Sequence, residues 1–251
     1  MERDDLASLA GFFSADQPLA PGVTVLLGQE AAHHARVRRI EAGGPVFVVD
    51  GVGARGVGRI VRLTKQDMQV TLEQVHRSPR PPEAHLLVPI GDKDRMLWCA
   101  EKCTELGATS WTPILWNRSR SVSPRGEGSA FRERVRARMR SALVQSHGAW
   151  LPDVPDDASI DQVLADPSPN ETRLVLDVSG EPIGHTHLSA PVTIAIGPEG
   201  GFDGEEFRQL RAARFRPVSV GANVLRFETA AVAALAIVRA ALGASPEIAN
   251  G

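Results

Sequence analysis

The segment 194-IAIGPEGGF-202 runs an apolar, β-branched strand straight into a glycine-rich loop that carries one carboxylate. Residues 192–196 have the composition of a buried strand in a parallel sheet, and glycines let the following loop turn tightly and approach a ligand. Asp203, with Glu206 three residues later, predicts a capping box for a helix that ends at Ala213. Open α/β sheets bind ligands at such a junction; the alternative is an ordinary strand-to-helix turn.

A second group of polar residues stands before an apolar helix near the carboxyl end. Residues 215–220 predict another buried strand, and residues 231–242 predict an almost wholly apolar helix. Arg226, Glu228 and Thr229 lie between them. Buried charge is costly unless it is paired or used. The cluster therefore predicts either a functional site or a structural Arg226–Glu228 pair that caps the helix.

These two motifs resemble those of the trefoil-knot (SPOUT) RNA methyltransferases, and more narrowly the bacterial enzymes that methylate N3 of a uridine in 16S ribosomal RNA. The sequences GPEGGF at 197–202 and LRFETA at 225–230 carry the resemblance most specifically. Further matching segments lie along nearly the whole chain: HARVRR at 34–39, KDRM at 93–96, KCTELGA at 102–108, NRS at 117–119 and QSHGAWLP at 145–152.

The chain departs from the pattern of this family at several positions. Asn223 stands where the family usually has arginine, and Phe227 stands where it has threonine. Trp116 and Asn117 replace a serine and a glutamate, and the arginine expected near Gly148 is absent. These differences bear on the target and the catalytic efficiency more than on the fold.

The resemblance implies a methyl transfer from S-adenosylmethionine to a ring nitrogen. Uridine N3 carries a proton at neutral pH, so the site needs a base or a cation that stabilises the anionic ring. Arg226 fits the role of the cation, while Glu199 or Glu228 accepts a proton or orients Arg226. These three residues are the catalytic candidates, and no metal is expected.

Cofactor recognition in such folds uses mainly backbone groups of the loops that follow strands. The resemblance places S-adenosylmethionine on three loops and the start of the last helix. The candidate residues are Leu176, Asp177, Ile196, Gly197, Pro198, Glu199, Gly200, Gly201, Val220, Gly221, Val224, Leu225 and Thr229.

The net charge of −2 conceals a strong asymmetry along the chain. Residues 31–80 carry a net charge of +5 and residues 118–140 a net charge of +6, so the remainder sums to −13. Localised basic segments on an acidic chain predict a polyanion-binding face. The RNA-binding candidates are His34, Arg36, Arg38, Arg39, Arg55, Lys93, Arg95, Arg118 and Gln145.

An amphipathic helix is predicted over residues 132–145, in the second basic segment. Its apolar face consists of Phe131, Val135, Met139, Ala142 and Leu143. The arginines at alternate positions from 132 to 140 form either a solvated helix face or an RNA contact, and the sequence leaves both open.

The proline-rich residues 77–82 predict a stiff linker between two domains, at 1–78 and 83–251. Before the linker, a helix over 30–40 and closely spaced strands predict a small β barrel, which the resemblance makes a PUA-like RNA-binding domain. The predicted strands are 23–27, 45–50, 56–63 and 68–75. The GVGARG sequence at 51–56 mimics a dinucleotide-binding loop, but the residues after it alternate as in a strand, which predicts a hairpin turn.

After the linker, strands alternate with helices. Strands are predicted over 86–90, 109–115, 173–178, 192–196 and 215–220, and a helix over 94–106 with Gly107 just past its end. This alternation predicts an α/β fold with helices on both faces of a parallel sheet. Because ordinary chains avoid knots, the trefoil comes from the resemblance alone.

Composition predicts a cytoplasmic protein. No apolar run is long enough to span a membrane, and the acidic residues 1–5 lack the basic start of a signal peptide. Cys99 and Cys103 are four residues apart in a predicted helix, which fits free, buried thiols better than a metal site or a disulfide.

The leading hypothesis is thus methylation of uridine N3 in 16S rRNA, with the 30S subunit as partner and a homodimer as the implied assembly. The nearest alternative is a related knotted RNA methyltransferase that acts on a 2′-hydroxyl or a tRNA base. A non-catalytic RNA-binding protein is the alternative from another class. A nucleotide-hydrolysing enzyme is disfavoured because no glycine loop carries a Walker-type Gly-Lys-Ser/Thr sequence.

Overall fold

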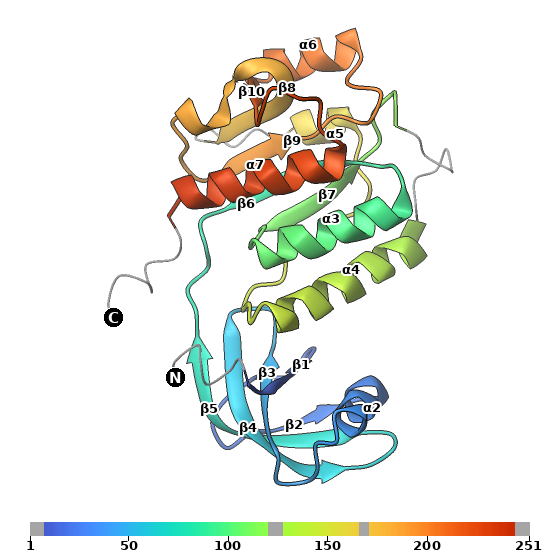
Figure 1. Cartoon of the computed structure of the whole chain (residues 1–251), viewed down its shortest axis with the longest axis vertical. Coiled ribbons are helices and arrows are strands. Elements are labelled where there is room, and N and C mark those ends of the chain that lie inside the picture. The colour runs from blue at the N-terminus through green and yellow to red at the C-terminus, as the bar shows by residue number, and fades with distance from the viewer. Residues whose placement is uncertain (1–7, 120–127, 166–170, 244–251) are drawn as a thin grey trace. The chain divides into compact units, whose positions relative to one another are not determined.

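The computed structural model describes residues 8–119, 128–165 and 171–243 (Figure 1). The acidic residues 1–5, on which the expectation about a signal peptide rests, lie outside these ranges. Contacts divide the chain into two units, residues 1–80 with 140–151 and residues 81–139 with 152–251. The predicted linker divides the chain only once, so the sequence does not predict that residues 140–151 belong to the first unit.

In its described residues, the first unit contains a five-stranded sheet in the order β1-β3-β4-β5-β2 and helix α2. Its elements are β1 (Ala10–Phe13), β2 (Thr24–Leu27), α2 (Gln29–Val37), β3 (Pro45–Val49), β4 (Ala54–Leu63) and β5 (Met68–Arg77). The four predicted strands and the predicted helix are confirmed. Strand β1 was not predicted, because four residues that pair in parallel with β3 give no turn signal of a hairpin.

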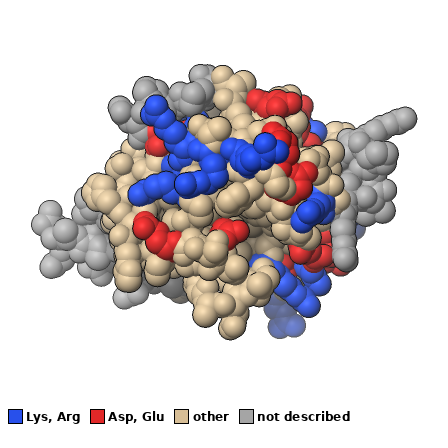
Figure 2. Space-filling model, turned by 90° about the horizontal axis from the view of Figure 1, so that it is seen from above, with Lys and Arg blue, Asp and Glu red and all other residues tan. Residues whose placement is uncertain are grey.

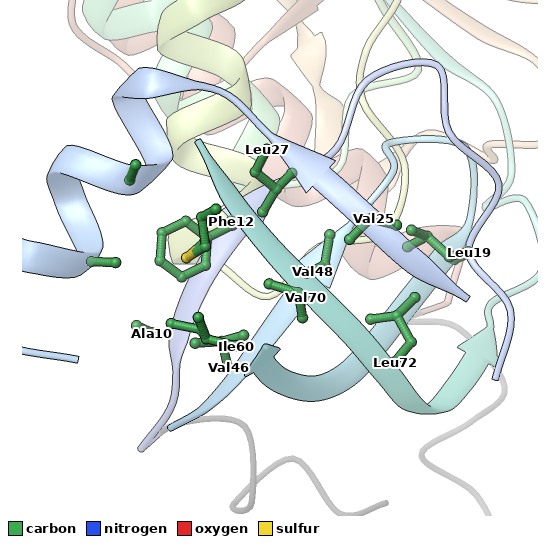
Figure 3. Close-up of a cluster of buried hydrophobic side chains, with 14 residues drawn as sticks. Ala10, Phe12, Leu19, Val25, Leu27, Val46, Val48, Ile60, Val70 and Leu72 are labelled. Atoms are coloured by element: carbon green, nitrogen blue, oxygen red, sulfur yellow. The ribbon is translucent and has the colours of Figure 1, made fainter. Parts of the chain in front are cut away.

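The sheet of the first unit curls around a cluster of buried side chains (Figure 3). Phe12, Val48, Ile60 and Val70 come from four different strands and point into this cluster in Figure 3. The curl is aided by a bulge between Val57 and Gly58, because bulges increase local twist. A Cβ at Gly58 would lie 2.1 Å from the carbonyl oxygen of Thr71, so only glycine fits there.

Residues 50–53 form the turn of the β3–β4 hairpin, as predicted. The carboxylate of Asp50 accepts hydrogen bonds from the amides of Val52 at 2.8 Å and Ala54 at 2.9 Å. The following residues are paired in strand β4, so the glycines of this segment do not open a dinucleotide-binding helix.

The second unit is a mixed α/β domain around a parallel sheet, which confirms the predicted fold class at this level. The strand order is β10-β8-β9-β6-β7, and every neighbouring pair is parallel. The strands are β6 (Ala84–Pro89), β7 (Ser110–Ile114), β8 (Thr172–Pro182), β9 (Val192–Ala195) and β10 (Arg216–Ser219). The helices are α3 (Lys93–Glu105), α4 (Gly128–Gln145), α5 (Ile160–Leu164), η1 (Ile183–His185), α6 (Gly204–Ala212) and α7 (Phe227–Ala241); the part of α4 from residue 140 onward belongs to the first unit.

Helices cover the sheet on both faces. Leu87, Val175 and Ala195 pack in one cluster with residues of α5 and α6. Helix α7 contacts β6, β9 and α3 instead, and Figure 1 shows α3 and α7 side by side in front of the sheet. The alternation of side chains along each strand thus supplies two apolar layers.

The residues predicted to end α3 and to start α6 do so in the structure. The amide of Gly107 donates to Thr104 and that of Ala108 donates to Cys103, which is the hydrogen-bond pattern of a Schellman motif with Gly107 at φ +77°. The capping box of Asp203 and Glu206 is present at α6. Helix α7 starts at Phe227, four residues before the predicted start, so the polar cluster belongs to its first turn.

The apolar face predicted for α4 is confirmed, since its five residues are all buried. The arginines of α4 contact their own chain, which favours a structural role for them. Arg132 pairs with Asp156, Arg136 with Glu133, Arg138 with Glu101, and Arg140 lies over the ring of Phe13 at 5.6 Å. On the face shown in Figure 2, Lys and Arg side chains are likewise bordered by Asp and Glu side chains.

Cys99 and Cys103 are both buried, as predicted, with their sulfur atoms 3.8 Å apart. The hydrogen bond with Cys99 and burial raise the pKa of the Cys103 thiol. Among the described residues, no group of His, Cys, Asp and Glu is arranged to hold a metal ion. None of the helices in the described ranges has the length and apolar composition needed to cross a bilayer.

Candidate active site at the carboxyl edge of the parallel sheet

Three adjacent strands of the second unit are in register where β9 ends. Val175 of β8 is in register with Ala195 of β9 and with Pro217 of β10. The three segments named as cofactor candidates follow these positions at the carboxyl side of the sheet. Parallel α/β sheets bind ligands at this edge.

Strand β8 runs to Pro182 rather than ending near residue 178 as predicted. Its register with β10 jumps between Pro217 and Val218, which leaves residues 176–180 in a large bulge that contains Leu176 and Asp177. A Cβ at Gly180 would lie 2.5 Å from backbone atoms of Pro217 and Val218. This close approach requires glycine and fixes the bulge against β10.

The segment after β7 is tied to the glycine-rich loop by side chains that depart from the family pattern. The indole of Trp116 donates to the carbonyl of Ile196 at 3.0 Å. The backbone amide of Asn117 donates to the carboxylate of Glu206 at 2.6 Å, and its side-chain Nδ2 donates to Asp203 at 2.5 Å. Trp116 and Asn117 therefore hold the loop and the start of α6 in place.

Arg118, predicted to bind RNA, takes part in the same attachment. Its guanidinium donates to the carbonyls of Gly200 at 3.1 Å and Phe202 at 3.4 Å. Backbone amides, that of Glu206 first, and the side chain of Asn117 donate to Asp203 and hold the pKa of its carboxyl below the usual value. The loop is thus braced by a charged helix cap on one side and by Arg118 on the other.

Arg95 of α3 connects two of the catalytic candidates. Its guanidinium forms an ion pair with Glu199 of the glycine-rich loop, and its Nε lies 3.9 Å from Oε1 of Glu228 in the first turn of α7. The alternative Arg226–Glu228 pair is wrong, because Glu228 faces Arg95. In the described part of the chain, the exposed Arg226 makes no hydrogen bond or ion pair, although it occupies the N-cap position of α7.

Glu228 is 8% exposed, and its Oε2 has no hydrogen-bond partner among the described residues. Buried polar atoms without partners are rare and require an explanation. The neighbouring Phe227 is buried, and its ring lies near Gly91 in the β6–α3 loop. Phe227 therefore packs in the core instead of facing the loop edge.

Several of the cofactor candidates are exposed, whereas Ile196 and Pro198 are buried. Val224 is 84% exposed, and Gly221 and Thr229 are also exposed. A Cβ placed at Gly201 or at Gly221 would have no atom of the described chain within 4 Å. These positions leave open space beside the loops.

The RNA-binding candidates fall in both units. In the first unit, His34, Arg36, Arg38 and Arg39 are exposed, as is Gln145. Partial burial, followed by the charge of Arg38, lowers the pKa of the His34 imidazole.

Two basic candidates contact their own chain. Arg55 donates to the carbonyl of His147 at 3.0 Å and to the hydroxyl of Ser78 at 2.9 Å, which favours a structural role over the predicted phosphate contact. Lys93 of the second unit lies over the ring of Phe131 at 5.7 Å.

Sequence reasoning assigned Arg95 to RNA and treated Trp116 only as a departure. The roles of both depend on partners far along the chain, since Arg95 lies 104 residues from Glu199 and Trp116 lies 80 residues from Ile196. One signal was available for Arg95: an arginine in the first turn of a helix opposes the helix dipole and needs an acidic partner.

Comparisons with known proteins identify the family of the chain. A family model described as an RNA methyltransferase domain matches residues 78–239. Ribosomal RNA small subunit methyltransferase E of Synechocystis is 30% identical over 229 residues, which cover 87% of this chain and 74% of the relative. The protein of that name in Mycobacterium bovis is 28% identical and covers 90% of each chain.

Two solved structures resemble the chain over nearly its whole length. Ribosomal RNA small subunit methyltransferase E from Neisseria gonorrhoeae, bound to S-adenosyl methionine, has a TM-score of 0.82 and 27% identity, and covers 91% of this chain and 95% of its own. A putative methyltransferase from Legionella pneumophila in complex with the same cofactor has a TM-score of 0.84 and 26% identity, with 93% and 98% covered. Since the family model spans most of the chain, the chain belongs to the RNA methyltransferase domain family.

Proposed function

We propose that this protein transfers a methyl group from S-adenosylmethionine to N3 of a uridine in 16S ribosomal RNA. The observation that carries the proposal is that Arg95 joins Glu199 of the glycine-rich loop to the buried Glu228 in α7, near Arg226, which has no partner among the described residues. Relatives named for methylation of small-subunit ribosomal RNA support the substrate class.

The residues at the sheet edge fit the proposed cofactor. S-Adenosylmethionine carries a cationic sulfonium centre, which suits a site that holds the carboxylates of Glu199 and Glu228. Loops that leave open space at Gly201 and Gly221 allow a ligand to approach the backbone. We assign the cofactor to residues 176–177, 196–201 and 220–225, with Thr229; when bound, it supplies the electrophilic methyl group.

The catalytic residues act on the uracil ring. A carboxylate, Glu199 or Glu228, takes the proton from N3, and the charge that develops on the ring spreads to the uracil oxygens. Arg226 is exposed and has no partner in the described chain, so its guanidinium is available to stabilise that charge. Positioning by the braced loop supplies the in-line approach that methyl transfer requires.

The wider assembly follows from the same proposal. We assign the first unit a PUA-like, RNA-binding barrel in which His34, Arg36, Arg38, Arg39 and Gln145 contact RNA phosphates. In the second unit we assign RNA contacts to Lys93 and Arg118, and we take the chain of this unit to be knotted as in SPOUT enzymes. An enzyme that methylates bases of the small subunit works where 30S particles are, so we assign the protein to the cytoplasm.

Helix α7 supports the proposal of a homodimer. Its buried face contains Ala231, Ala234, Leu235 and Val238, which pack within the unit. The other side carries further apolar residues that are only partly buried or exposed: Val232, Ala233, Ala236, Ile237 and Ala240. A helix with apolar residues on both sides can pack one side within its own unit and the other against a second copy of the chain.

The test is methyl transfer from labelled S-adenosylmethionine to unmodified 30S subunits, with identification of the methylated nucleoside. The wild-type protein should form 3-methyluridine, and Arg226→Ala should lower the rate about 100-fold. Arg208→Ala on the outside of α6 is the matched control, since its guanidinium contacts only its own helix. A different methylated nucleoside would reassign the target, and cofactor binding without transfer to any RNA would refute the proposed function.

A further inference from the structure

We infer that Glu228 is the group that accepts the N3 proton, and that Arg95 is a positioning residue that holds Glu228 and Glu199 in their places. The inference rests on the proposed function, and it assigns separate roles to two carboxylates that the sequence leaves equivalent. Its basis is the arrangement of three charged side chains from three separate segments.

Glu228 has the properties of a held base. It is 8% exposed, and one carboxylate oxygen lies 3.9 Å from Nε of Arg95. The other oxygen is buried and accepts no hydrogen bond from the described residues. A buried acceptor without a donor destabilises the folded chain, so a ligand N–H is the natural partner for this oxygen.

The position of Glu228 in α7 brings it close to Arg226 and leaves one of its oxygens without a hydrogen bond from the described residues. It lies in the first turn of α7, where the helix dipole stabilises negative charge. Its Oε2 accepts no hydrogen bond from the described residues, so this oxygen is left to accept a proton. The N-cap residue of the same helix is Arg226, so the base and the cation are two residues apart.

Glu199 has a different environment. One of its oxygens is already bound by the guanidinium of Arg95, and its side chain is 31% exposed, against 11% for that of Glu228. This oxygen of Glu199 is already used by the guanidinium, whereas Oε2 of Glu228 accepts no hydrogen bond from the described residues. Glu199 therefore serves to anchor Arg95 to the glycine-rich loop.

The backbone around Arg95 is well fixed. Its amide donates to the carboxylate of Asp92 at 3.0 Å. The next residue, Met96, is fully buried, and its sulfur accepts from the amide of Gly91 at 3.4 Å. Arg95 thus reaches from a rigid helix end to both carboxylates, and it couples the glycine-rich loop to the start of α7.

The proposed step is balanced. The N3–H bond of uridine breaks, the proton forms a bond to Oε2 of Glu228, and the electron pair stays on the ring opposite Arg226. N3 then forms a bond to the methyl carbon as the sulfur–carbon bond breaks, with its electrons left on a neutral thioether. The proton on Glu228 passes to water before the next turnover.

The experiment compares full-length variants in single-turnover methyl transfer to 30S subunits between about pH 6 and about pH 9. Binding of S-adenosylhomocysteine, measured by calorimetry, is the readout independent of activity. Glu228→Gln should slow transfer about 100-fold or more at neutral pH, and its rate should rise log-linearly with pH as uridine ionises unaided. Its affinity for S-adenosylhomocysteine should stay within about threefold of wild type.

Arg95 and Glu199 variants test the division of roles. Arg95→Gln should lower the rate about tenfold and change the pH profile, while Arg95→Lys should restore much of the rate because it keeps the charge. Glu199→Gln should cost less than about tenfold and keep the wild-type pH profile. Glu205→Gln, a first-turn carboxylate of α6 that pairs with Arg208, is the matched control and should change nothing.

Several outcomes would overturn the inference. A Glu228→Gln rate within about threefold of wild type would refute it while leaving 3-methyluridine formation, and hence the proposed function, intact. Loss of S-adenosylhomocysteine binding in step with the rate would make Glu228 a cofactor ligand instead. If Glu228→Gln does not fold, Glu228→Asp decides: it should slow transfer but keep the wild-type pH profile. Failure of the wild type to methylate uridine would instead refute the proposed function.

Discussion

The indole nitrogen of Trp116 donates a hydrogen bond to the carbonyl of Ile196 across 3.0 Å. Ile196 is buried and lies between the end of β9 and the glycine-rich loop. Trp111, five residues earlier in the chain, is also buried, but its indole nitrogen has no partner in the described ranges. The two tryptophans therefore form a natural pair for measuring what the bond to the loop contributes.

Trp116→Phe should destabilise the fold more than Trp111→Phe does. Both changes remove a similar volume from the core, but only Trp116→Phe leaves the carbonyl of Ile196 without its donor. The difference should be about 1–3 kcal/mol in the free energy of unfolding, measured by urea denaturation. Equal losses would show that the bond adds nothing to the fold.

Gly180→Ala should be strongly destabilising, because the new Cβ would lie 2.5 Å from the backbone of β10, which cannot move aside. We expect a loss of more than about 2 kcal/mol. Gly184→Ala is the control, since a Cβ there meets no described atom within 4 Å. Thermal unfolding of both variants measures the effect, and similar melting temperatures would contradict the close approach.

Arg239 of α7 holds the second unit together at the amino edge of the sheet. Its guanidinium donates to the carbonyls of Pro82 and Gly107 and to the hydroxyl of Thr109 at 3.3 Å. Arg239→Met keeps the apolar stem and removes the guanidinium that donates to the carbonyls of Pro82 and Gly107. The loss should be about 2–4 kcal/mol, whereas Arg208→Met on the exposed side of α6 should stay within about 0.5 kcal/mol.

The charged cap of α6 should make stability depend on pH. Hydrogen bonds from the amide of Glu206 and the side chain of Asn117 lower the pKa of Asp203 in the folded state. Its stabilising contribution is therefore present above the unfolded pKa and is lost as pH falls through the folded pKa. The difference in melting temperature between wild type and Asp203→Asn should shrink between about pH 6 and about pH 3. A difference that stays constant over this range would contradict it.

The sequence predicted the helix ends and the buried helix face that depend on residues close together in the chain. The end of α3 at Gly107 and the cap of α6 at Asp203 were found because a glycine at positive φ and a capping box act within one helical turn. The buried face of α4 was found because its spacing matches the helical period.

Features that depend on distant partners were missed. The predicted start of α7 at residue 231 is four residues late, because the contact of Glu228 with Arg95 cannot be seen from residues 225–230 alone. The extension of β8 to Pro182 depends on the register of β10 beyond its bulge. The return of residues 140–151 to the first unit depends on the packing of Leu143 with Phe47 and Val49.

The strand order also determines when the catalytic unit can form during synthesis. Strand β9 is inserted between β8 and β6, and Ala84 pairs with Val192 far along the chain. Contacts of such long range form slowly, because the intervening chain must be ordered before they stabilise anything. A nascent chain that has not yet extended past β9 therefore lacks the centre of its sheet, and we expect the methyltransferase unit to fold only after nearly all of it has left the ribosome.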